Sequence, residues 1–257
     1  MTDPALPRSA PPRVVVESVH PEVDAGRFPV KRIVGDVLEV SADVFTEGHD
    51  RVSATLRWRE PGGEWRERPM SPLGNDRFAG ACTLTSTGLW EYTVEAWVDR
   101  FGTWRSGLAR KVEARQDVEL ELAEGAVLLE AVADRAPAAA AAGLRTASRA
   151  IADDRPQAAR VKDALSDTLQ ADAALAPERS NPTTYAPVLV VEVERERAGC
   201  GAWYEFFPRS ASPEPGRHGT LADASARLNY VAEMGFDVVY LPPIHPIGRA
   251  FRKGPNN

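Results

Sequence analysis

The sequence predicts a multidomain protein: an antiparallel β-sandwich, a helical bundle, and a parallel βαβ unit of the kind that begins a (β/α)8 barrel. Three observations support this prediction. Apolar and polar residues alternate in residues 13–116, alanine dominates residues 117–180, and residues 199–257 follow a strand, loop, helix and strand pattern. Residues 1–12 are expected to be a disordered N-terminus, and residues 181–198 are expected to be a linker in which residues 188–193 are extended.

The alternation in the first region is clearest in residues 51–59, where every second residue is apolar: Val52, Ala54, Leu56 and Trp58. A strand with this pattern has one face against a core and one face in water. The same parity recurs in residues 38–44, 78–84 and 90–98, and Gly- and Pro-containing turns separate the runs. Short strands at this spacing predict an immunoglobulin-like sandwich.

The second region has the composition of helices, with ten alanines among residues 131–150. Asp154 can cap a helix that carries Pro156 in its first turn. The apolar residues of that helix recur every four positions: Val161, Leu165 and Leu169. We expect an antiparallel bundle of three or four short helices.

The third region contains two apolar strands, residues 200–207 and 238–241, with a helix between them. Thr220 can cap this helix, Asp223 occupies the capping-box position, and Gly235 can end it. The apolar residues of the helix are Leu221, Leu228, Val231 and Met234. A strand, a helix and a strand in this order predict parallel strands with a right-handed crossover.

Composition excludes several classes of function. A net charge of −6 argues against a protein that binds nucleic acid by neutralising phosphates. No run approaches the ~20 apolar residues of a membrane span, and residues 1–12 lack the apolar core of a signal peptide. Cys82 and Cys200 lie in different predicted domains, so neither a disulfide framework nor a metal cluster is indicated. We expect a cytoplasmic protein without a metal or cofactor.

Ligands of parallel α/β barrels bind at the carboxyl ends of the strands, which places the loops after Phe207 and Leu241 at a candidate site. The second loop ends with Arg252, Lys253 and Asn256, whose cations and carboxamide suit a polyhydroxylated or phosphorylated ligand. The alternative is a solvated basic loop.

Other polar and aromatic residues have structural interpretations that we favour over functional ones. His218 and His245 are expected to hold loops in place, and Glu205 to pair with a group such as Arg209. The aromatic residues expected in cores are Trp58, Trp90, Trp203, Tyr204, Phe206 and Phe207. Trp65 and Trp104, which lie near turns, are the candidates for stacking on sugars at the surface.

Several motifs of the third region resemble those of one enzyme family. They are residues 203–210 (Trp-Tyr-Glu-Phe-Phe-Pro-Arg-Ser), 218–220 (His-Gly-Thr), 230–248, and 252–257 (Arg-Lys-Gly-Pro-Asn-Asn). Together they resemble the α-1,4-glucan:maltose-1-phosphate maltosyltransferases of the α-amylase superfamily. The order of β-sandwich and helical bundle is also similar to the two N-terminal domains of this family.

The resemblance implies transfer of maltosyl units from maltose 1-phosphate to the non-reducing end of α-1,4-glucans, with retention and release of phosphate. It implies that residues 199–257 are the first βαβ unit of an incomplete, truncated (β/α)8 barrel, and that the catalytic carboxylates lie beyond this sequence. We therefore expect no activity from this chain alone. Lys253 matches a lysine that resembles a donor-site contact, and Arg252 and Asn256 are weaker candidates.

The family also implies a homodimer that takes part in glycogen or α-glucan biosynthesis. Two other functions stay open at the level of sequence. The chain could be a non-catalytic module that binds glucan or mediates dimerisation, or it could belong to an α-amylase-type glycoside hydrolase.

Overall fold

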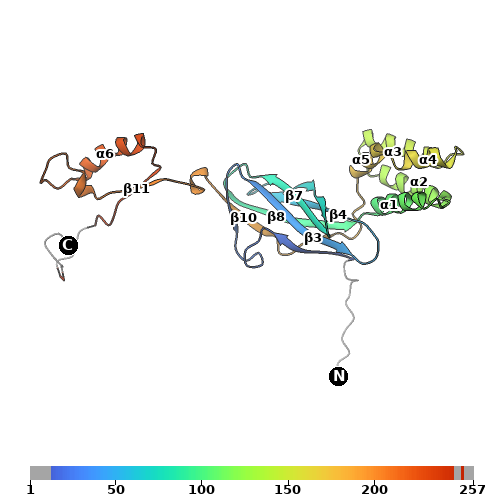
Figure 1. Cartoon of the computed structure of the whole chain (residues 1–257), viewed down its shortest axis with the longest axis horizontal. Coiled ribbons are helices and arrows are strands. Elements are labelled where there is room, and N and C mark those ends of the chain that lie inside the picture. Colours follow the sequence, from blue (N-terminus) through green and yellow to red (C-terminus); the bar gives the residue numbers. More distant parts are fainter. Residues whose placement is uncertain (1–12, 246–249, 252–257) are drawn as a thin grey trace, which may run out of the picture.

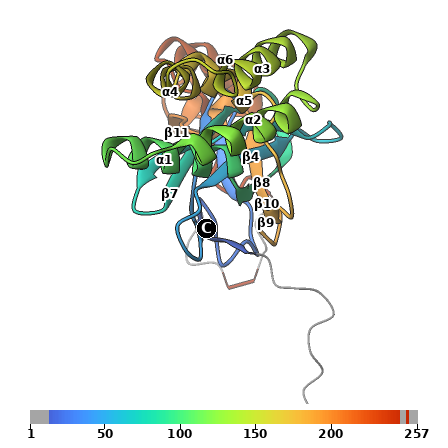
Figure 2. The same cartoon turned by 90° about the vertical axis from the view of Figure 1, so that its right-hand side faces the viewer.

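The computed structural model describes residues 13–245 and 250–251. Within them, two β-sheets form the middle of the molecule, helices α1 to α5 lie at one end, and a small unit of two strands and one helix lies at the other (Figure 1). Figure 2 views the molecule from the helical end, with these helices in front of the sheets. The fold is therefore mixed, with helices and mostly antiparallel sheets.

The first sheet has four strands, and every neighbouring pair is antiparallel. In spatial order its strands are β1 (Val14–His20), β3 (Val37–Thr46), β7 (Arg77–Thr83) and β6 (Ser71–Gly74). The long β3 is central because it pairs with β1 on one side and β7 on the other.

The second sheet has six strands. In spatial order they are β2 (Val30–Ile33), β10 (Leu189–Glu194), β8 (Gly88–Val98), β4 (Val52–Arg59) and β5 (Arg66–Pro69), with β9 (Thr183–Thr184) paired to β8. Only the pairing of β10 with β2 is parallel within this sheet. Residues far apart in the sequence therefore meet in one sheet.

The two sheets enclose a single hydrophobic core, because each contributes its alternate apolar residues to it. The first sheet contributes Leu38, Val40, Ala42, Val44, Phe78 and Cys82, and the second contributes Ala54, Leu56, Trp58, Trp90, Tyr92 and Val94. Trp58 and Trp90 are core residues, as predicted from their parity with aliphatic neighbours. Trp90 also donates its indole N–H to the Ser86 carbonyl at 3.0 Å.

The structure differs from the predicted linker at residues 181–198. This stretch supplies β9 and β10, and β10 lies inside the second sheet between β2 and β8. The physical reason is its own alternation, which buries Leu189, Val191 and Val193 in the core of the sheets.

The helical part contains α1 (Arg100–Glu113), α2 (Glu119–Ala133), α3 (Ala138–Ile151), α4 (Gln157–Ala164) and α5 (Asp167–Ala174). It has a core of its own, centred on Leu108, Leu122, Leu129, Leu144 and Ile151. Helix α1 lies within the residues 13–116 that were predicted to be sandwich. It follows β8 at once because an Asp99 carboxylate oxygen accepts a hydrogen bond from the Gly102 amide at 2.8 Å.

The helix predicted to start at Asp154 is two helices. Helix α4 begins after Pro156 and ends at Ala164, and the chain then restarts as α5. Ser166 adopts extended backbone angles, and its hydroxyl accepts a hydrogen bond from the Leu169 amide at 3.3 Å. The cap formed by Ser166 therefore starts a new helix, although apolar residues continue to recur every four positions.

The last described unit contains the single-turn helices η1 (Glu196–Ala198) and η2 (Pro208–Ala211), strands β11 (Trp203–Glu205) and β12 (Val238–Tyr240), and helix α6 (Leu221–Glu233). The two strands are parallel, as predicted, and Tyr204 lies opposite Val239. Helix α6 has the predicted capping box of Thr220 and Asp223. Gly235 follows its end with a φ of 84°, a conformation that favours glycine.

Trp203 on β11 and Phe207 just after it, which were predicted to belong to the core of a barrel, are exposed in this chain. The exposed fraction is 63% for Trp203 and 54% for Phe207. Tyr204 is partly buried, with its ring centroid 5.2 Å from that of Phe236. The buried residues of α6 are Ala224 and Val231, whereas other apolar side chains of the unit, such as Leu228 and Tyr240, are exposed.

Candidate functional site

The carboxyl ends of β11 and β12 lie side by side, because the strands are parallel and in register. At this edge the Phe206 amide donates a hydrogen bond to the Tyr240 carbonyl at 3.3 Å. The loops that follow the two strands therefore start from neighbouring points. This edge is where a parallel α/β protein places its ligands.

The first of these loops folds back on itself. The Gly219 amide donates a hydrogen bond to the Arg209 carbonyl at 2.8 Å, which closes the loop before helix α6 begins. A Cβ atom at Gly219 would lie 2.3 Å from the Pro208 carbonyl oxygen, so only glycine fits there. This contact fixes His218 and Thr220 on either side of the glycine.

An ion pair and a capping box hold the end of the same loop. The Arg217 guanidinium donates two hydrogen bonds, of 3.1 and 3.3 Å, to the Asp223 carboxylate. The Thr220 amide and hydroxyl donate to the same carboxylate at 2.7 and 2.8 Å. These bonds, with the Thr220 amide first and Arg217 second, lower the pKa of Asp223 to about 2.

The predicted ligand-binding residues Arg252, Lys253 and Asn256 lie outside the described residues, so their placement stays a prediction. His218 and His245 are both exposed, in the loops that follow β11 and β12. Glu205 is exposed on β11, and its pairing with Arg209 stays a hypothesis. Within residues 13–245 and 250–251, no group of His, Cys, Asp and Glu is arranged to hold a metal ion.

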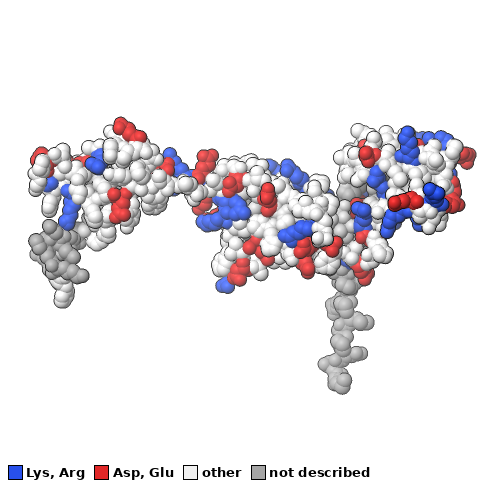
Figure 3. All heavy atoms as spheres, in the orientation of Figure 1, with Lys and Arg blue, Asp and Glu red and all other residues white. Residues whose placement is uncertain are grey.

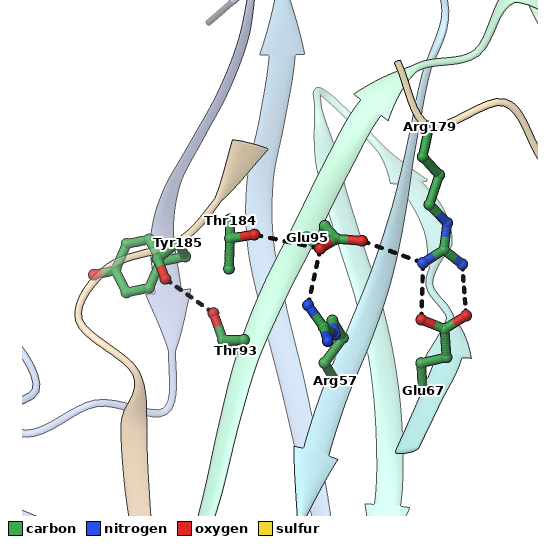
Figure 4. A network of polar contacts seen from close by, with 7 residues as sticks. All are labelled: Arg57, Glu67, Thr93, Glu95, Arg179, Thr184 and Tyr185. Atoms are coloured by element: carbon green, nitrogen blue, oxygen red, sulfur yellow. Dashed lines mark hydrogen bonds and ion pairs between the residues drawn. The ribbon is translucent and has the colours of Figure 1, made fainter. Parts of the chain in front are cut away.

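A second polar cluster lies on the outer face of the six-stranded sheet, where the chain returns from the helices (Figure 4). The Arg179 guanidinium donates two hydrogen bonds to Glu67, at 2.6 and 2.8 Å, and one to Glu95 at 3.2 Å. Arg57 donates to the other oxygen of Glu95 at 2.9 Å. The Arg179 guanidinium also lies 4.5 Å from the ring centroid of Trp97.

This cluster, which we call the Arg179 clamp, consists of Arg57, Glu67, Glu95, Trp97 and Arg179. Next to it, Thr93 donates a hydrogen bond to the Tyr185 carbonyl at 3.0 Å, and Thr184 donates to Glu95 at 3.4 Å. Arg179 lowers the pKa of Glu67 through the hydrogen bond between them. The clamp therefore attaches the chain that returns from the helices to the sheet.

Sequence reasoning missed the Arg179 clamp, because its members are isolated polar residues far apart in the chain. The sequence indicated only that Arg57 and Glu95 point away from the core, because they alternate with apolar residues along their strands. Parity places a side chain on a face, but it does not identify the partner that covers that face.

The two tryptophans proposed for a surface role have different surroundings. Trp65 is partly exposed beside two guanidinium groups, 5.4 Å from Arg57 and 4.8 Å from Arg59. Trp104 donates its indole N–H to the Glu121 carbonyl at 2.7 Å. Its ring lies directly against Gly125, where a Cβ would come within 2.0 Å of the ring.

Trp104 also lines an open cleft of about 1480 Å³ between the sheets and helices α1 and α2. Charged side chains of both signs are interspersed over the sheets and the helices on the face shown in Figure 3. That distribution differs from the clustered basic surface of nucleic-acid-binding proteins. In the described part of the chain, no helix combines the length and apolar character needed to cross a bilayer.

Comparison with known proteins identifies the family. The sequence profile described as "Alpha-1,4-glucan:maltose-1-phosphate maltosyltransferase, domain N/S" matches residues 12–195. The chain belongs to this family. The matched segment ends directly after β10 (Leu189–Glu194), which agrees with a module that includes both sheets and the helices.

Individual relatives extend the match beyond this module. The maltosyltransferase of Chlorobaculum tepidum is 47% identical over 246 residues, which cover 95% of this chain and 37% of the relative. The enzyme of Myxococcus xanthus is 48% identical over 252 residues, covering 95% of this chain and 38% of the relative. Maltosyltransferase 1 of Streptomyces coelicolor is 47% identical over 254 residues, with 95% and 37% coverage. The chain spans a little over a third of the length of these relatives.

The family predicted from the motifs is thus confirmed by a separate part of the chain. The motifs lie at residues 203–257, whereas the profile matches residues 12–195. The two parts of the sequence agree on one family without sharing a residue.

Proposed function

We propose that this chain is the N-terminal part of an enzyme that transfers maltosyl units from maltose 1-phosphate to the non-reducing end of α-1,4-glucans. The transfer retains the configuration, releases phosphate and serves glycogen or α-glucan biosynthesis. The observation that carries this proposal is the family match at residues 12–195, together with relatives named as this maltosyltransferase that align with 95% of the chain.

The proposed domain layout is an immunoglobulin-like β-sandwich, a helical bundle, and the first βαβ unit of a (β/α)8 barrel. The parallel register of β11 and β12 and the intervening helix α6 support the last assignment. The exposed Trp203 and Phe207 also support it, because further strands and helices of a barrel would cover them. A complete barrel takes about 250 residues, far more than follow Gly199 in this sequence.

Retention implies two successive displacements through a covalent glycosyl-enzyme, with one carboxylate as nucleophile and another as acid and base. In the α-amylase superfamily these groups lie on later barrel strands, so this chain alone is proposed to have no turnover. Lys253 is proposed to contact the donor, because its ammonium group can neutralise phosphate charge. Arg252 and Asn256 are proposed as weaker contacts in the same loop.

The protein is further proposed to be a cytoplasmic homodimer that needs neither metal nor cofactor. The thiols of Cys82 and Cys200 are both free, which suits a reducing compartment. Sedimentation velocity of the purified chain measures the oligomeric state directly.

A chimera tests the proposed activity. This chain replaces the matching segment of the Chlorobaculum tepidum enzyme, and phosphate release from maltose 1-phosphate is measured with and without maltoheptaose. We expect release only when maltoheptaose is present, and no release from the 257-residue chain by itself. Sugar release without an acceptor would show an amylase-type hydrolase, and a folded chimera without activity would contradict the proposal.

The donor contact is tested in the same chimera. Lys253→Ala should raise the KM for maltose 1-phosphate by about tenfold or more, because it removes a charge that binds phosphate. Lys253→Arg retains the charge and should lose less. An unchanged KM in the alanine variant would refute the role of Lys253.

A further inference from the structure

The cleft between the sheets and the helices has walls from three parts of the chain. One wall comes from the start of β1, the turn at Asp50 and the end of β8. Helices α1 and α2 form the other wall, and residues 178–182, which follow the helices, close one side. The cleft lies outside the β11 and β12 edge, and the proposed transfer reaction does not use it.

The charges of this cleft compensate one another. Most of its charged side chains form ion pairs along its walls: Arg13 with Asp50 at 2.7 Å, Arg100 with Glu178 at 3.0 Å, and Lys111 with Glu121. The remaining charged side chain of the lining is the carboxylate of Glu124. A phosphorylated ligand would therefore meet no excess of positive charge, and the cleft favours a neutral ligand that donates and accepts hydrogen bonds.

The cleft also has an apolar strip along α2. Val127 is 73% exposed on this wall, and Leu128 and Ala131 lie beside it. The partly exposed ring of Trp104 continues the strip from α1, and the exposed carboxamide of Asn181 faces the cleft from the returning chain. Such a surface suits a sugar chain. The C–H faces of its rings can pack on the apolar strip, and its hydroxyl groups can form hydrogen bonds with the polar side chains.

We propose that this cleft is an accessory binding site for a linear α-1,4-glucan segment. The choice of glucan rests on the proposed function, because that reaction extends such a chain. A site on the sandwich and the helical part would hold a long acceptor close to the enzyme and raise its effective concentration at the catalytic barrel.

Gly107 allows a test that does not damage the fold. It lines the cleft from α1, and a Cβ at this position would meet no atom within 4 Å. A larger residue there would occupy the cleft, and replacing glycine within a helix favours the helical state. Gly107→Phe should therefore leave the thermal unfolding midpoint unchanged or higher while it blocks the site.

Isothermal titration of the 257-residue chain with maltoheptaose measures the binding. We expect Gly107→Phe to raise the Kd at least about tenfold relative to the parent chain. The matched control is Ala142→Phe, which places the same ring on an exposed position of α3 outside the cleft. Trp65→Ala removes a partly exposed aromatic ring outside the cleft, and both controls should bind like the parent.

Two outcomes would overturn the proposal. Either the parent chain shows no maltoheptaose binding, or Gly107→Phe binds as well as the parent; if Trp65→Ala then weakens binding, the glucan binds near Trp65 instead. A change in sedimentation coefficient caused by Gly107→Phe, without a change in binding, would assign the cleft to a second copy of the chain instead. An active chimera in any of these cases would leave the transferase proposal intact while this inference fails.

Discussion

Two tryptophans on strands show how the two β-regions of this protein differ. Trp90 on β8 is 1% exposed, whereas Trp203 on β11 is 63% exposed. Trp90 lies between two sheets, each of which covers the other. Trp203 lies in a unit that consists, among the described residues, of one two-stranded sheet, helix α6 and short connecting turns. Two sheets packed face to face bury each other's apolar side chains. A single βαβ unit requires further structure to bury its own.

Hydrogen exchange tests this difference most directly, and it should show the largest effect. Amides in the centre of β8 should exchange only through global unfolding, because both their neighbouring strands and the opposite sheet must separate. Amides of β11 and β12 should exchange through local opening, with protection lower by several orders of magnitude. Mass spectrometry of peptides covering Tyr92 and Tyr204 measures both. Equal protection in a monomer would contradict the comparison.

Truncating each tryptophan gives the next largest effect. Trp90→Ala should lower the free energy of unfolding of the two-sheet domain by about 3–5 kcal/mol, because it leaves a cavity and removes the hydrogen bond to the Ser86 carbonyl. Trp203→Ala should change the free energy of unfolding of its own unit by less than about 0.5 kcal/mol, because the ring is exposed. Urea denaturation followed by circular dichroism measures both variants. Similar losses would show that Trp203 is covered in solution.

The sequence was most informative where a single local pattern dictates the structure. Alternation predicted the faces of β4 and β8, and the Thr220 and Asp223 pair predicted the start of α6. It was least informative where distant segments meet. Residues 181–198 looked like a linker because the partners of β10, which are β2 and β8, lie more than ninety residues earlier in the chain. Only the fold brings these strands together.

The same limit applies to the candidate site. Motifs at the ends of β11 and β12 predicted a candidate ligand edge, and the structure places these two strand ends side by side, while ligand binding there stays a prediction. The Arg179 clamp, and the cleft between the sheets and helices α1 and α2, combine residues from separate elements. No short sequence pattern indicates either of them. Such sites depend on tertiary pairing, which periodicity does not encode.

Breaking the Arg179 clamp should lower the free energy of unfolding by less than truncating Trp90 does. Arg179→Ala should lower the free energy of unfolding by about 1–3 kcal/mol, because the buried Glu95 loses one of its two arginine partners. Arg179→Lys keeps the charge but lacks the planar fork, so its loss should be smaller. The control is Arg145→Ala, which breaks an exposed ion pair with Asp134 of 2.7 Å and should cost about 0–1 kcal/mol. Equal losses for Arg179→Ala and the control would show that the clamp is only a surface contact.

The smallest effect is a local dependence on pH at the start of α6. The pKa of Asp223 is lowered from its ordinary value of 3.8 to about 2, so the folded state favours the charged carboxylate. Its stabilising contribution is therefore complete above pH 3.8 and is lost as the pH falls through about 2.

NMR spectra test this dependence on pH. The amide signals of Thr220 and Ala224 should shift as the pH falls from 3.8 to about 2, because the protonated acid accepts weaker hydrogen bonds from Arg217 and the Thr220 amide. In Asp223→Asn these shifts should disappear, since asparagine does not titrate. A midpoint near 3.8 in the parent chain would mean that the capping box and the ion pair do not form in solution, and the βαβ unit would then lack even its best local anchor.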